Sequence, residues 1–235
     1  MENNSLSNQK IKDLTKLNMS KYRREEKKFI VEGAHLVDEA RKANLLLEAY
    51  SIKDKPGYIK INESQMKKLC HTATLVEEIG VCKMLDKPNI LSNKILILDA
   101  IQDPGNLGSL MRSAKAFGFD TIILGDGSCD IYNDKVIRSS QGAIFKLSFI
   151  NSKLTEFIPS LKDYYVYGTN VRNGISVDEC IKNEKIALVL GNEGNGISKE
   201  VNDVIEKNIY IPLENTESLN VCVAGSILMY ELSKR

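Results

Sequence analysis

The sequence is poor in the residues that mark disulfide-stabilised, metal-binding or membrane-spanning proteins. It has no tryptophan, five prolines, five cysteines and two histidines among 235 residues. The cysteines are scattered, odd in number and lack a C-x-x-C pair, so we expect reduced thiols, no disulfide framework and no metal site. The histidines lie outside any H-E-x-x-H or triad-like pattern.

Long apolar runs and a charge excess are also absent. No stretch approaches the length of a membrane span, and the polar start MENNSLSNQK is unlike a signal peptide. We therefore expect a cytoplasmic protein without a membrane partner. The formal net charge is only +1, so local charge, not a global basic field, must indicate any nucleic-acid partner.

The composition is that of an ordinary globular protein, long enough for one large or two small domains. Pro, Asn and Ser cluster at residues 85–94 (LDKPNILSNK), between two patterned segments. We place a boundary there, which gives domains 1–91 and 92–235.

The first part of the chain has the pattern of a small α/β domain. Apolar residues recur at helical spacing near its start, and the segments FIV and HLVDEARKANL then predict a strand and a helix. Before that strand lies a cluster of basic residues: Lys10, Lys12, Lys16, Lys21, Arg23, Arg24, Lys27 and Lys28. Glu25 and Glu26 interrupt the cluster, so it is either a solvated helix face or an arm that follows RNA phosphates.

The second part alternates strands and helices. The strand-like runs are apolar throughout: KILILDA, TIILG, IFKLSFI, YYVYGT, IALVLG and NIYIP. Such alternation predicts a parallel sheet covered by helices on both faces. Ligands bind beyond the carboxyl ends of strands in these sheets, which selects the loops at 99–108, 191–196 and 211–220.

The loop at 191–196 is rich in glycine. Its spacing is G-x-x-G-x-G, not G-x-G-x-x-G, and it lacks the Lys and Ser/Thr of a phosphate-binding P-loop. A dinucleotide or nucleoside-triphosphate site is therefore not supported. One alternative is a plain strand-to-helix connection with Ser198 capping the next helix; the other is a ligand turn in which Glu193 orients a hydroxyl or a cation.

The other two loops carry polar residues beside helix starts. After the turn DPGN, a predicted helix puts Asn106, Ser109 and Arg112 on one face, with Arg112 directed back toward Asn106 and the strand ends. A solvated Arg112 is the alternative. In the third loop, Ser218 opens the final helix, with Asn220 in its first turn. The buried stripe of that helix is expected to be Val221, Ala224, Ile227 and Leu228.

Together the three loops resemble the signature motifs of the SpoU (TrmH-like) family of RNA 2′-O-ribose methyltransferases, in the SPOUT superfamily. The matching segments are DPGNLGSLMRSAKAFG, LVLGNEGNGIS and IPLENTESLNVCVAGSILMYE, with DKVIRSSQGAIFKL as an intermediate block. The N-terminal segment KLNMSKYRREEKKFIVEGAHLVDEA more weakly resembles the accessory substrate-binding domain of the family, which is similar to ribosomal-protein RNA-binding domains.

The resemblance implies an α/β fold: a parallel-sheet SPOUT-type catalytic domain with a C-terminal trefoil knot, preceded by the small RNA-binding domain. It also implies S-adenosyl-L-methionine as cofactor, held mostly by backbone groups. The cofactor-binding positions carried over from the family are Gly191, Glu193, Gly196, Ile211, Leu213, Leu219, Asn220 and Val221.

The resemblance further implies roles in the reaction. Arg112 is the candidate equivalent to the family base, but an arginine is effectively always protonated. We therefore expect Arg112 to grip an RNA phosphate and stabilise the developing alkoxide, with Asn106 holding Arg112 or the ribose. Glu193, Ser218 and Asn220 are expected to position substrate and cofactor, and RNA is expected to contact Lys21, Arg23, Arg24 and Arg138.

The resulting prediction is an RNA 2′-O-methyltransferase that acts on ribosomal RNA. Transfer RNA as substrate, a Rossmann-type nucleotide enzyme, and a non-catalytic RNA-binding or ribosome-assembly protein are the alternatives. The final helix, SLNVCVAGSILMYEL, is apolar over more than one face, and the family dimerises through its knotted domain. A two-fold homodimer is therefore expected.

Overall fold

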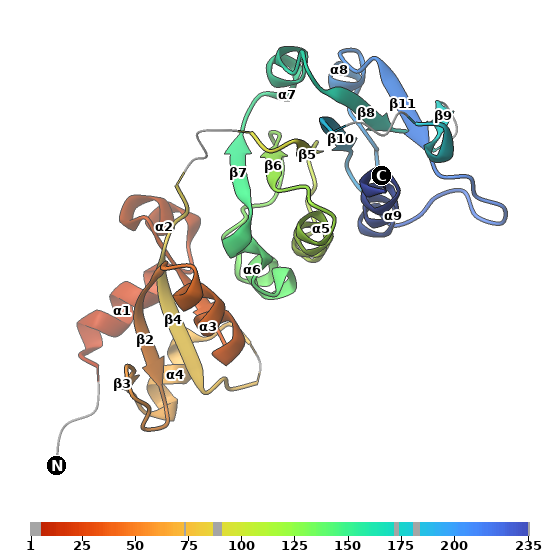
Figure 1. The fold of residues 1–235 in the computed structure, drawn as a ribbon. Helices are drawn as coiled ribbons and strands as arrows, with labels where there is room; N and C mark the ends of the chain where they lie inside the picture. Colours follow the sequence, from red (N-terminus) through yellow and green to blue (C-terminus); the bar gives the residue numbers. More distant parts are fainter. Residues whose placement is uncertain (1–5, 73, 87–90, 172–173, 181–183, 235) are drawn as a thin grey trace. The chain divides into compact units, whose positions relative to one another are not determined.

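The computed structural model describes residues 6–72, 74–86, 91–171, 174–180 and 184–234. The chain forms two compact units (Figure 1), Met1–Asp86 with Asp130–Phe145 and Lys87–Cys129 with Lys146–Arg235. Part of the predicted boundary, residues 87–90, lies outside the described residues. The predicted division at residue 91 did not anticipate that the segment 130–145 belongs to the first unit.

The first unit is a four-stranded sheet with helices. Its strands follow the order β1-β4-β2-β3, and only the β2–β3 pair is parallel. The predicted first helix is confirmed as α1, with its apolar residues buried in the core. The elements are α1 (Asn8–Lys16), α2 (Ser20–Glu26), β1 (Lys28–Glu32), α3 (Ala34–Lys42), β2 (Leu46–Ser51), β3 (Ile59–Lys60), α4 (Glu63–Leu69), β4 (Glu78–Lys83) and α6 (Asp134–Ser140).

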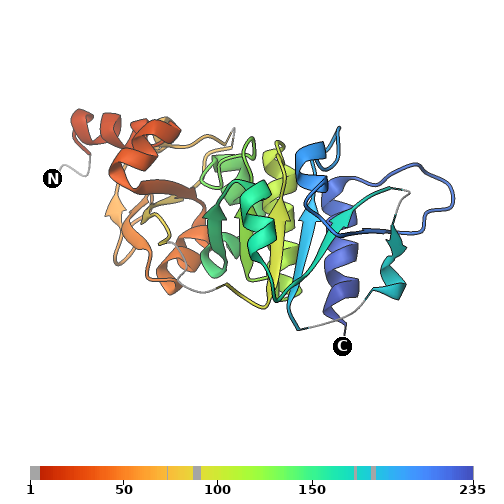
Figure 2. The same ribbon diagram turned by 90° about the horizontal axis from the view of Figure 1, so that it is seen from above.

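The second unit contains a seven-stranded parallel sheet in the order β7-β6-β5-β10-β8-β11-β9. Helices α5 and α9 cover one face and α7 and α8 the other (Figures 1 and 2), which confirms the predicted arrangement. The elements are β5 (Lys94–Leu98), α5 (Pro104–Ala116), β6 (Thr121–Leu124), β7 (Ser148–Asn151), α7 (Leu154–Phe157), η2 (Ile158–Ser160), β8 (Tyr165–Thr169), β9 (Ile175–Ser176), η3 (Val177–Glu179), β10 (Ile186–Leu190), α8 (Lys199–Asn202), β11 (Lys207–Tyr210) and α9 (Val221–Ser233). The short helix η1 (Ala143–Lys146) crosses the boundary, since its first three residues belong to the first unit.

Strand β10 lies near the middle of this sheet and shows why its sequence is apolar throughout. Both faces of the sheet are covered, so all five residues of β10 are buried. Ala187 and Val189 pack into the cluster beneath α7 and α8, while Leu190 faces α9. Each buried aliphatic side chain contributes roughly 1.5–3 kcal/mol to the free energy of burial, so this strand anchors the unit.

Helix α9 differs from the predicted final helix at its start and in its buried face. It begins after Asn220, which is the N-cap, so the predicted start at Ser218 is wrong. The buried residues are Gly225, Leu228, Met229 and Leu232, and of the expected stripe only Leu228 belongs to that set. At 13 residues α9 is short, and none of the helices in the described ranges is long and apolar enough to cross a membrane.

Candidate active site at the carboxyl edge of the sheet

Strand register brings the first two predicted loops together. Leu98 of β5 pairs with Leu190 of β10, and the next N–H along the chain, that of Asp99, donates to the Leu190 carbonyl at 2.8 Å. The loops at 99–108 and 191–196 therefore begin side by side. β11 belongs to the same parallel sheet, so the loop at 211–220 starts at the same edge, as the sequence predicted.

The turn DPGN is the start of α5. Asp103 is the N-cap, and its Oδ1 accepts from the N–H of Asn106 at 2.8 Å, with Pro104 in the first turn. Ala100, three residues earlier, has φ of 55°, the left-handed region that a non-glycine residue rarely adopts. The loop therefore contains a backbone conformation that alanine disfavours.

The glycine-rich turn is closed by Asn192, which sequence reasoning missed. Its N–H and carbonyl form two bonds of 2.9 Å with Gly196, and its side-chain Oδ1 accepts from the N–H groups of Gly194 and Asn195 at 3.0 and 3.2 Å. Its Nδ2 donates to the carbonyl of Ala100 at 2.9 Å. An Asn followed two residues later by Gly is a turn signal that was available in the sequence.

Gly191 and Gly194 answer different structural demands in this turn. A Cβ on Gly191 would collide with the backbone of Gly196 and Ile197, so no other residue fits there. A Cβ on Gly194 would meet only Asn192 Oδ1, at 3.6 Å, an ordinary contact. Of these two glycines, only Gly191 is therefore required by the turn itself; Gly196 is favoured for another reason, its φ of 69°.

Glu193 and Asn106 join all three loops by hydrogen bonds. The Glu193 carboxylate accepts from the backbone N–H groups of Asp103 at 3.0 Å and Gln102 at 3.3 Å, and from Asn106 Nδ2 at 3.2 Å. Asn106 Oδ1 in turn accepts from Asn220 Nδ2 at 3.2 Å. The sequence placed these residues in one site, and the structure brings them into direct contact.

The Glu193 carboxyl is held in its charged form. Partial burial would raise its pKa, but hydrogen bonds from its own N–H, the N–H of Asp103, the Asn106 amide and the N–H of Gln102 outweigh that effect and lower it. A carboxylate with a lowered pKa is ionised at neutral pH, so it accepts hydrogen bonds but is a weak base for catalysis. Glu193 therefore organises the loops.

Asn220 serves two structures at once. Its Oδ1 accepts from the N–H groups of Cys222 and Val223 at 2.8 and 3.3 Å and so caps α9. Its Nδ2 is then left to donate to Asn106. The start of the last helix is thus fixed to the start of α5 by one side chain.

A pocket of about 580 Å³ lies beside this hydrogen-bonded group and falls in the usual range for small-ligand sites. It also includes Thr169, Asn170 and Val171 at the end of β8, which the sequence reasoning missed although the same strand-end rule selects them. None of the described side chains forms a group of three or more His, Cys, Asp or Glu suited to a metal ion. The predicted residues that line the pocket are Gly191, Glu193, Gly196, Ile211, Leu213, Ser218, Leu219 and Val221.

Arg112 lies on α5 with an exposed side chain and outside the lining of the pocket. Asn106 was predicted to hold Arg112 or the ribose; in this structure its amide is bonded to Glu193 and Asn220, and no bond to Arg112 is present among the described residues. Within the described residues, no hydrogen bond or ion pair engages the Arg112 guanidinium. Its charge is therefore available to a substrate.

The four predicted RNA-binding residues all lie in the first unit and differ in exposure. Arg23 is 7% exposed, so the prediction that it contacts phosphate is corrected: its charge is used inside the unit. Lys21 is 71% exposed in its side chain, and Arg24 is exposed on the same helix. Arg138 pairs with Asp134 at 2.7 Å and keeps about a third of its side chain exposed.

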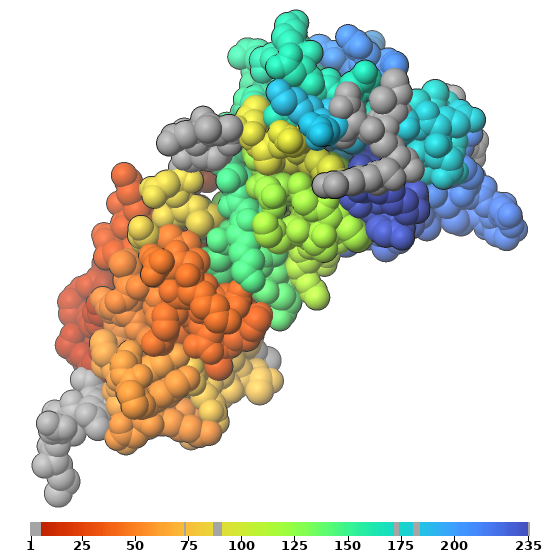
Figure 3. Space-filling model, in the orientation of Figure 1, coloured from red at the N-terminus to blue at the C-terminus, as the bar shows by residue number. Residues whose placement is uncertain are grey.

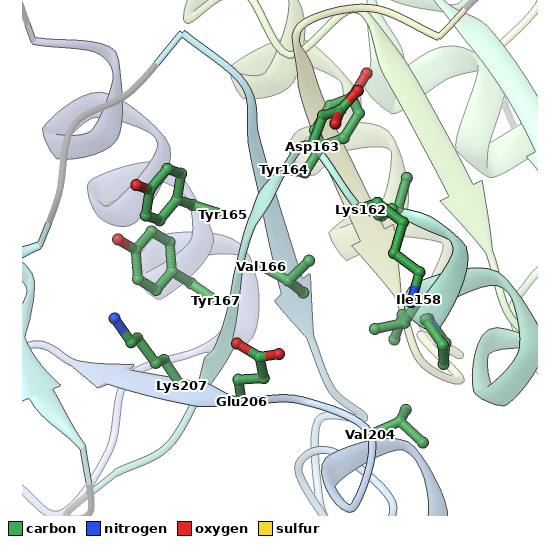
Figure 4. A pocket seen from close by; sticks show the side chains of 12 residues that line it. Ile158, Lys162, Asp163, Tyr164, Tyr165, Val166, Tyr167, Val204, Glu206 and Lys207 are labelled. Carbon is green, nitrogen blue, oxygen red and sulfur yellow. The ribbon is translucent and has the colours of Figure 1, made fainter.

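A second hollow, of about 470 Å³, lies at the amino ends of β8 and β11 (Figure 4). Tyr165 and Tyr167 point to one side of β8 there and Val166 to the other, with Lys207 at the start of the neighbouring strand β11 and Glu206 just before it. Ligands of parallel sheets bind at the opposite, carboxyl edge. The candidate site is therefore the pocket beside Glu193.

The fold and the site together define an α/β protein of the parallel-sheet class with a small-ligand pocket made by loops at the carboxyl ends of its strands. Two family models match the chain, that of the SpoU rRNA Methylase family over residues 93–230 and that of the MRM3-like substrate binding domain over residues 8–77. The chain belongs to the SpoU rRNA methylase family.

Individual relatives agree with this assignment. The chain is 37% identical to the 23S rRNA (guanosine(2553)-2′-O)-methyltransferase RlmP of Bacillus subtilis (strain 168), over 97% of each protein. It is similar in structure to a proposed RNA methyltransferase of the TrmH family from Porphyromonas gingivalis, with a TM-score of 0.87, 31% identity and 97% and 98% of the two chains covered. An AdoMet-bound rRNA methyltransferase from Sinorhizobium meliloti shares the fold, with a TM-score of 0.86, 23% identity and 97% and 95% covered.

Proposed function

We propose that the protein is an RNA 2′-O-ribose methyltransferase that uses S-adenosyl-L-methionine and acts on ribosomal RNA. The observation that carries the proposal is the direct bonding of Glu193, Asn106 and Asn220, one from each family motif, beside a glycine-lined pocket. A non-catalytic scaffold would need neither this arrangement nor an exposed arginine on α5 whose guanidinium has no bonded partner among the described residues.

The pocket residues fit the proposed cofactor. Gly191 lets the turn close on Gly196, and Gly194 and Gly196 line the pocket with open space where a side chain would be, so backbone groups can approach a nucleoside closely. Leu213 and Leu219 provide apolar walls for a base. S-adenosyl-L-methionine, when bound, supplies an activated methyl group, so the chain itself must chiefly orient the acceptor.

In the proposed mechanism Arg112 binds the phosphate next to the reacting ribose. Its guanidinium presents a planar pair of donors to phosphate oxygens and stabilises the negative charge that develops on the 2′-oxygen as the hydroxyl proton passes to solvent water. Glu193, Asn106 and Asn220 hold the loops so that ribose and methyl donor meet in line. Ser218 lines the same pocket and orients the substrate or cofactor there.

Ribosomal RNA is preferred to transfer RNA because the likeness to the 23S rRNA enzyme spans both units of this chain. The match to a substrate-binding domain over residues 8–77 supports the N-terminal part as the RNA-binding domain, with Lys21 and Arg24 as charged contacts. Arg138, in the segment 130–145 of the same compact unit, is a further proposed contact. We propose that residues 1–91, together with the segment 130–145, bind the substrate, and that the rest of 92–235 carries out catalysis. We also propose that the protein acts in the cytoplasm with its C-terminal part threaded as a trefoil knot.

We further propose a homodimer formed through α9. Val223 and Tyr230 lie seven residues apart on one face of the helix and are 47% and 49% exposed, and Ile227 between them is only half-buried. Tyr230 also contacts the ring of Phe117, just beyond α5, with centroids 5.6 Å apart. Figure 3 shows the surfaces of α5, in green, and α9, in dark blue, next to each other. An apolar face shared by two helices suits a two-fold interface.

The test is methyl transfer to RNA in vitro. Purified protein is incubated with 23S rRNA or total tRNA and radiolabelled S-adenosyl-L-methionine, and 2′-O-methyl positions are mapped in the product. We expect incorporation into one ribose of 23S rRNA. Incorporation into tRNA alone would replace the rRNA assignment, and cofactor binding without transfer to either RNA would favour the non-catalytic scaffold.

A further inference from the structure

Helices α5 and α9 lie side by side on one face of the parallel sheet (Figure 1), and both belong to the second unit. Asn106, in the first turn of α5, bonds to Asn220, the N-cap of α9. At the far end, the ring of Phe117, the C-cap of α5, contacts the ring of Tyr230, near the end of α9. The starts of the helices meet, and so do their ends, so α5 and α9 run parallel.

The middle of this interface is apolar and closely packed. A Cβ on Gly225 of α9 would lie 2.7 Å from Leu110 Cδ2 of α5 and 2.5 Å from Leu190 Cδ1 of β10, so a larger residue would push on both leucines. Both leucines are buried. Because apolar contacts are not directional, they draw the helices together without fixing how far one is rotated or shifted along the other.

Ser113 and Ser226 supply a directional contact in the same interface. Their Oγ atoms lie 2.7 Å apart, and the bond is partly buried. Ser226 Oγ donates its only proton to the carbonyl of Cys222, at 2.7 Å, so Ser113 is the donor in the serine pair. A hydrogen bond constrains an angle as well as a distance, so this pair fixes the position of one helix relative to the other.

Two hydrogen bonds thus join the helices, Asn106 to Asn220 and Ser113 to Ser226. They lie about two turns apart on α5, which is roughly 10 Å along the helix. One bond at the end of a helix leaves the rest of that helix free to rotate about it, whereas two bonds fix both its rotation and its axial position. In coiled coils, a single polar contact within an apolar interface sets the register in the same way.

Arg112 directly precedes Ser113 on α5. Its side chain is exposed, and among the described residues no hydrogen bond or ion pair holds it, so the helix alone determines where its guanidinium starts from. We infer that Ser113 and Ser226 are positioning residues for methyl transfer, which fix the rotation of α5 and thereby the direction in which Arg112 reaches the RNA phosphate. This inference rests on the proposed function.

The test begins with Ser113→Ala and Ser226→Ala, assayed for methyl transfer to 23S rRNA. Each variant should lower kcat about tenfold, because small displacements of reacting groups have effects of that size. KM for RNA and the affinity for S-adenosyl-L-methionine should change less than about twofold, because the other contacts to both are intact. The double variant should be no worse than the poorer single variant, since the two serines share one bond.

A second cycle distinguishes positioning from a general effect on the fold. If Ser113 acts through Arg112, then Ser113→Ala should cause no further loss of rate in an Arg112→Ala background. Single-turnover kinetics measure the low rates of these variants. A loss in the double variant that multiplies the losses of S113A and R112A would overturn the inference, because it would show that the serine acts independently of Arg112.

Ser233→Ala is the matched control on the same helix. Its hydroxyl donates to the carbonyl of Tyr230 at 2.7 Å, as that of Ser226 does to Cys222, but within the described residues it makes no hydrogen bond to α5. This variant should keep the kcat of the wild type, and an equal loss of kcat would overturn the inference. Light scattering should show the wild-type oligomeric state for all the serine variants, and a change in S113A would instead place the bond in a subunit contact.

Amide exchange provides a readout that does not depend on activity. The N–H of Phe117 donates to the carbonyl of Ser113 at 3.0 Å, so it should exchange faster when the serine pair no longer holds the end of α5. The N–H of Asp99, bonded to the Leu190 carbonyl in the sheet, should exchange at the wild-type rate. Both are measured where far-UV circular dichroism shows the fold intact.

The outcomes separate the two proposals. If the wild type transfers no methyl group to any RNA, the proposed function fails, while faster exchange at Phe117 in the variants would still support the role of the serine pair in fixing α5. Unchanged kcat and exchange in folded variants would overturn the inference. A loss confined to KM for RNA would also overturn it, since that result places Ser113 or Ser226 in substrate binding.

Discussion

The side chain of Asn106 fixes how the three loops of the site meet. Its amide donates to the Glu193 carboxylate and accepts from the Asn220 amide, so it needs a donor and an acceptor on one short side chain. Aspartate has no donor to offer a carboxylate, and leucine has neither group. At this position only a primary amide of this length satisfies both neighbours.

Arg112→Ala should lower the methylation rate about a hundredfold or more, the scale for loss of one group that stabilises developing charge. Affinity for S-adenosyl-L-methionine should hardly change, because Arg112 lies outside the pocket. Arg112→Lys should not restore the rate, since an ammonium cannot present two parallel donors to phosphate. Single-turnover kinetics and calorimetry measure the two quantities; near-normal turnover of R112A would remove Arg112 from the mechanism.

Substitutions at two glycines should separate binding from folding. Gly194→Val should keep the melting temperature near that of the wild type, because its Cβ has room, but should weaken cofactor binding roughly tenfold or more by occupying the pocket. Gly191→Ala should instead reduce the free energy of unfolding by about 1–3 kcal/mol, since the backbone of the turn must move. Equal effects of both changes on stability would contradict this assignment.

The lowered pKa of Glu193 predicts a specific pH dependence. The folded-state pKa lies below the usual value, so the carboxylate stays ionised from about pH 8 to about pH 5. Over that range its contribution to stability and to cofactor binding is complete. Both should decline only as the pH falls through the folded-state pKa. Glu193→Gln should bind more weakly at neutral pH without that acid decline. Calorimetry of cofactor binding across this range is the measurement, and a decline between about pH 7 and pH 6 would disprove the assignment.

At the scale of elements, the apolar runs predicted all the strands of the large sheet except β9, which has only two residues. The site residues were predicted from motifs, but their bonds were not, because the direction of an amide such as that of Asn106 depends on three loops meeting in space. The start of α9 was missed since Ser218 and Asn220 are both good caps, and only the position of Asn106 favours the second.

The proposed interface on α9 should be sensitive to one buried charge. Val223→Glu should convert the dimer into a monomer, because an unpaired carboxylate would be desolvated at the centre of the contact. Leu47→Glu is a matched control: Leu47 is 49% exposed on β2 of the other unit, so the dimer should persist. Light scattering at micromolar concentration distinguishes the two, and a monomeric wild type would refute the interface.

At the scale of the whole molecule, the near-neutral net charge leaves the attraction for RNA to local clusters, and we propose that the basic N-terminal helices provide it. Replacing Lys21 and Arg24 together by glutamine should weaken RNA binding and reduce its salt slope by roughly one for each phosphate that is no longer neutralised. Saturating RNA should restore most of the rate, unlike in R112A. Fluorescence anisotropy at several salt concentrations checks this, and an unchanged slope would place the RNA-binding surface elsewhere.

The assignment of residues 130–145 to the first unit also governs when that unit can be completed on the ribosome. Phe29 is fully buried, and two of its ring neighbours, Tyr132 and Phe145, are translated long after β1 and β4. At roughly 5–20 residues per second, the chain between residues 86 and 145 takes roughly 3–12 s to synthesise. During that interval an apolar side of β1 has no cover from its own chain, so the nascent protein should engage holdase chaperones until the β6–β7 connection emerges.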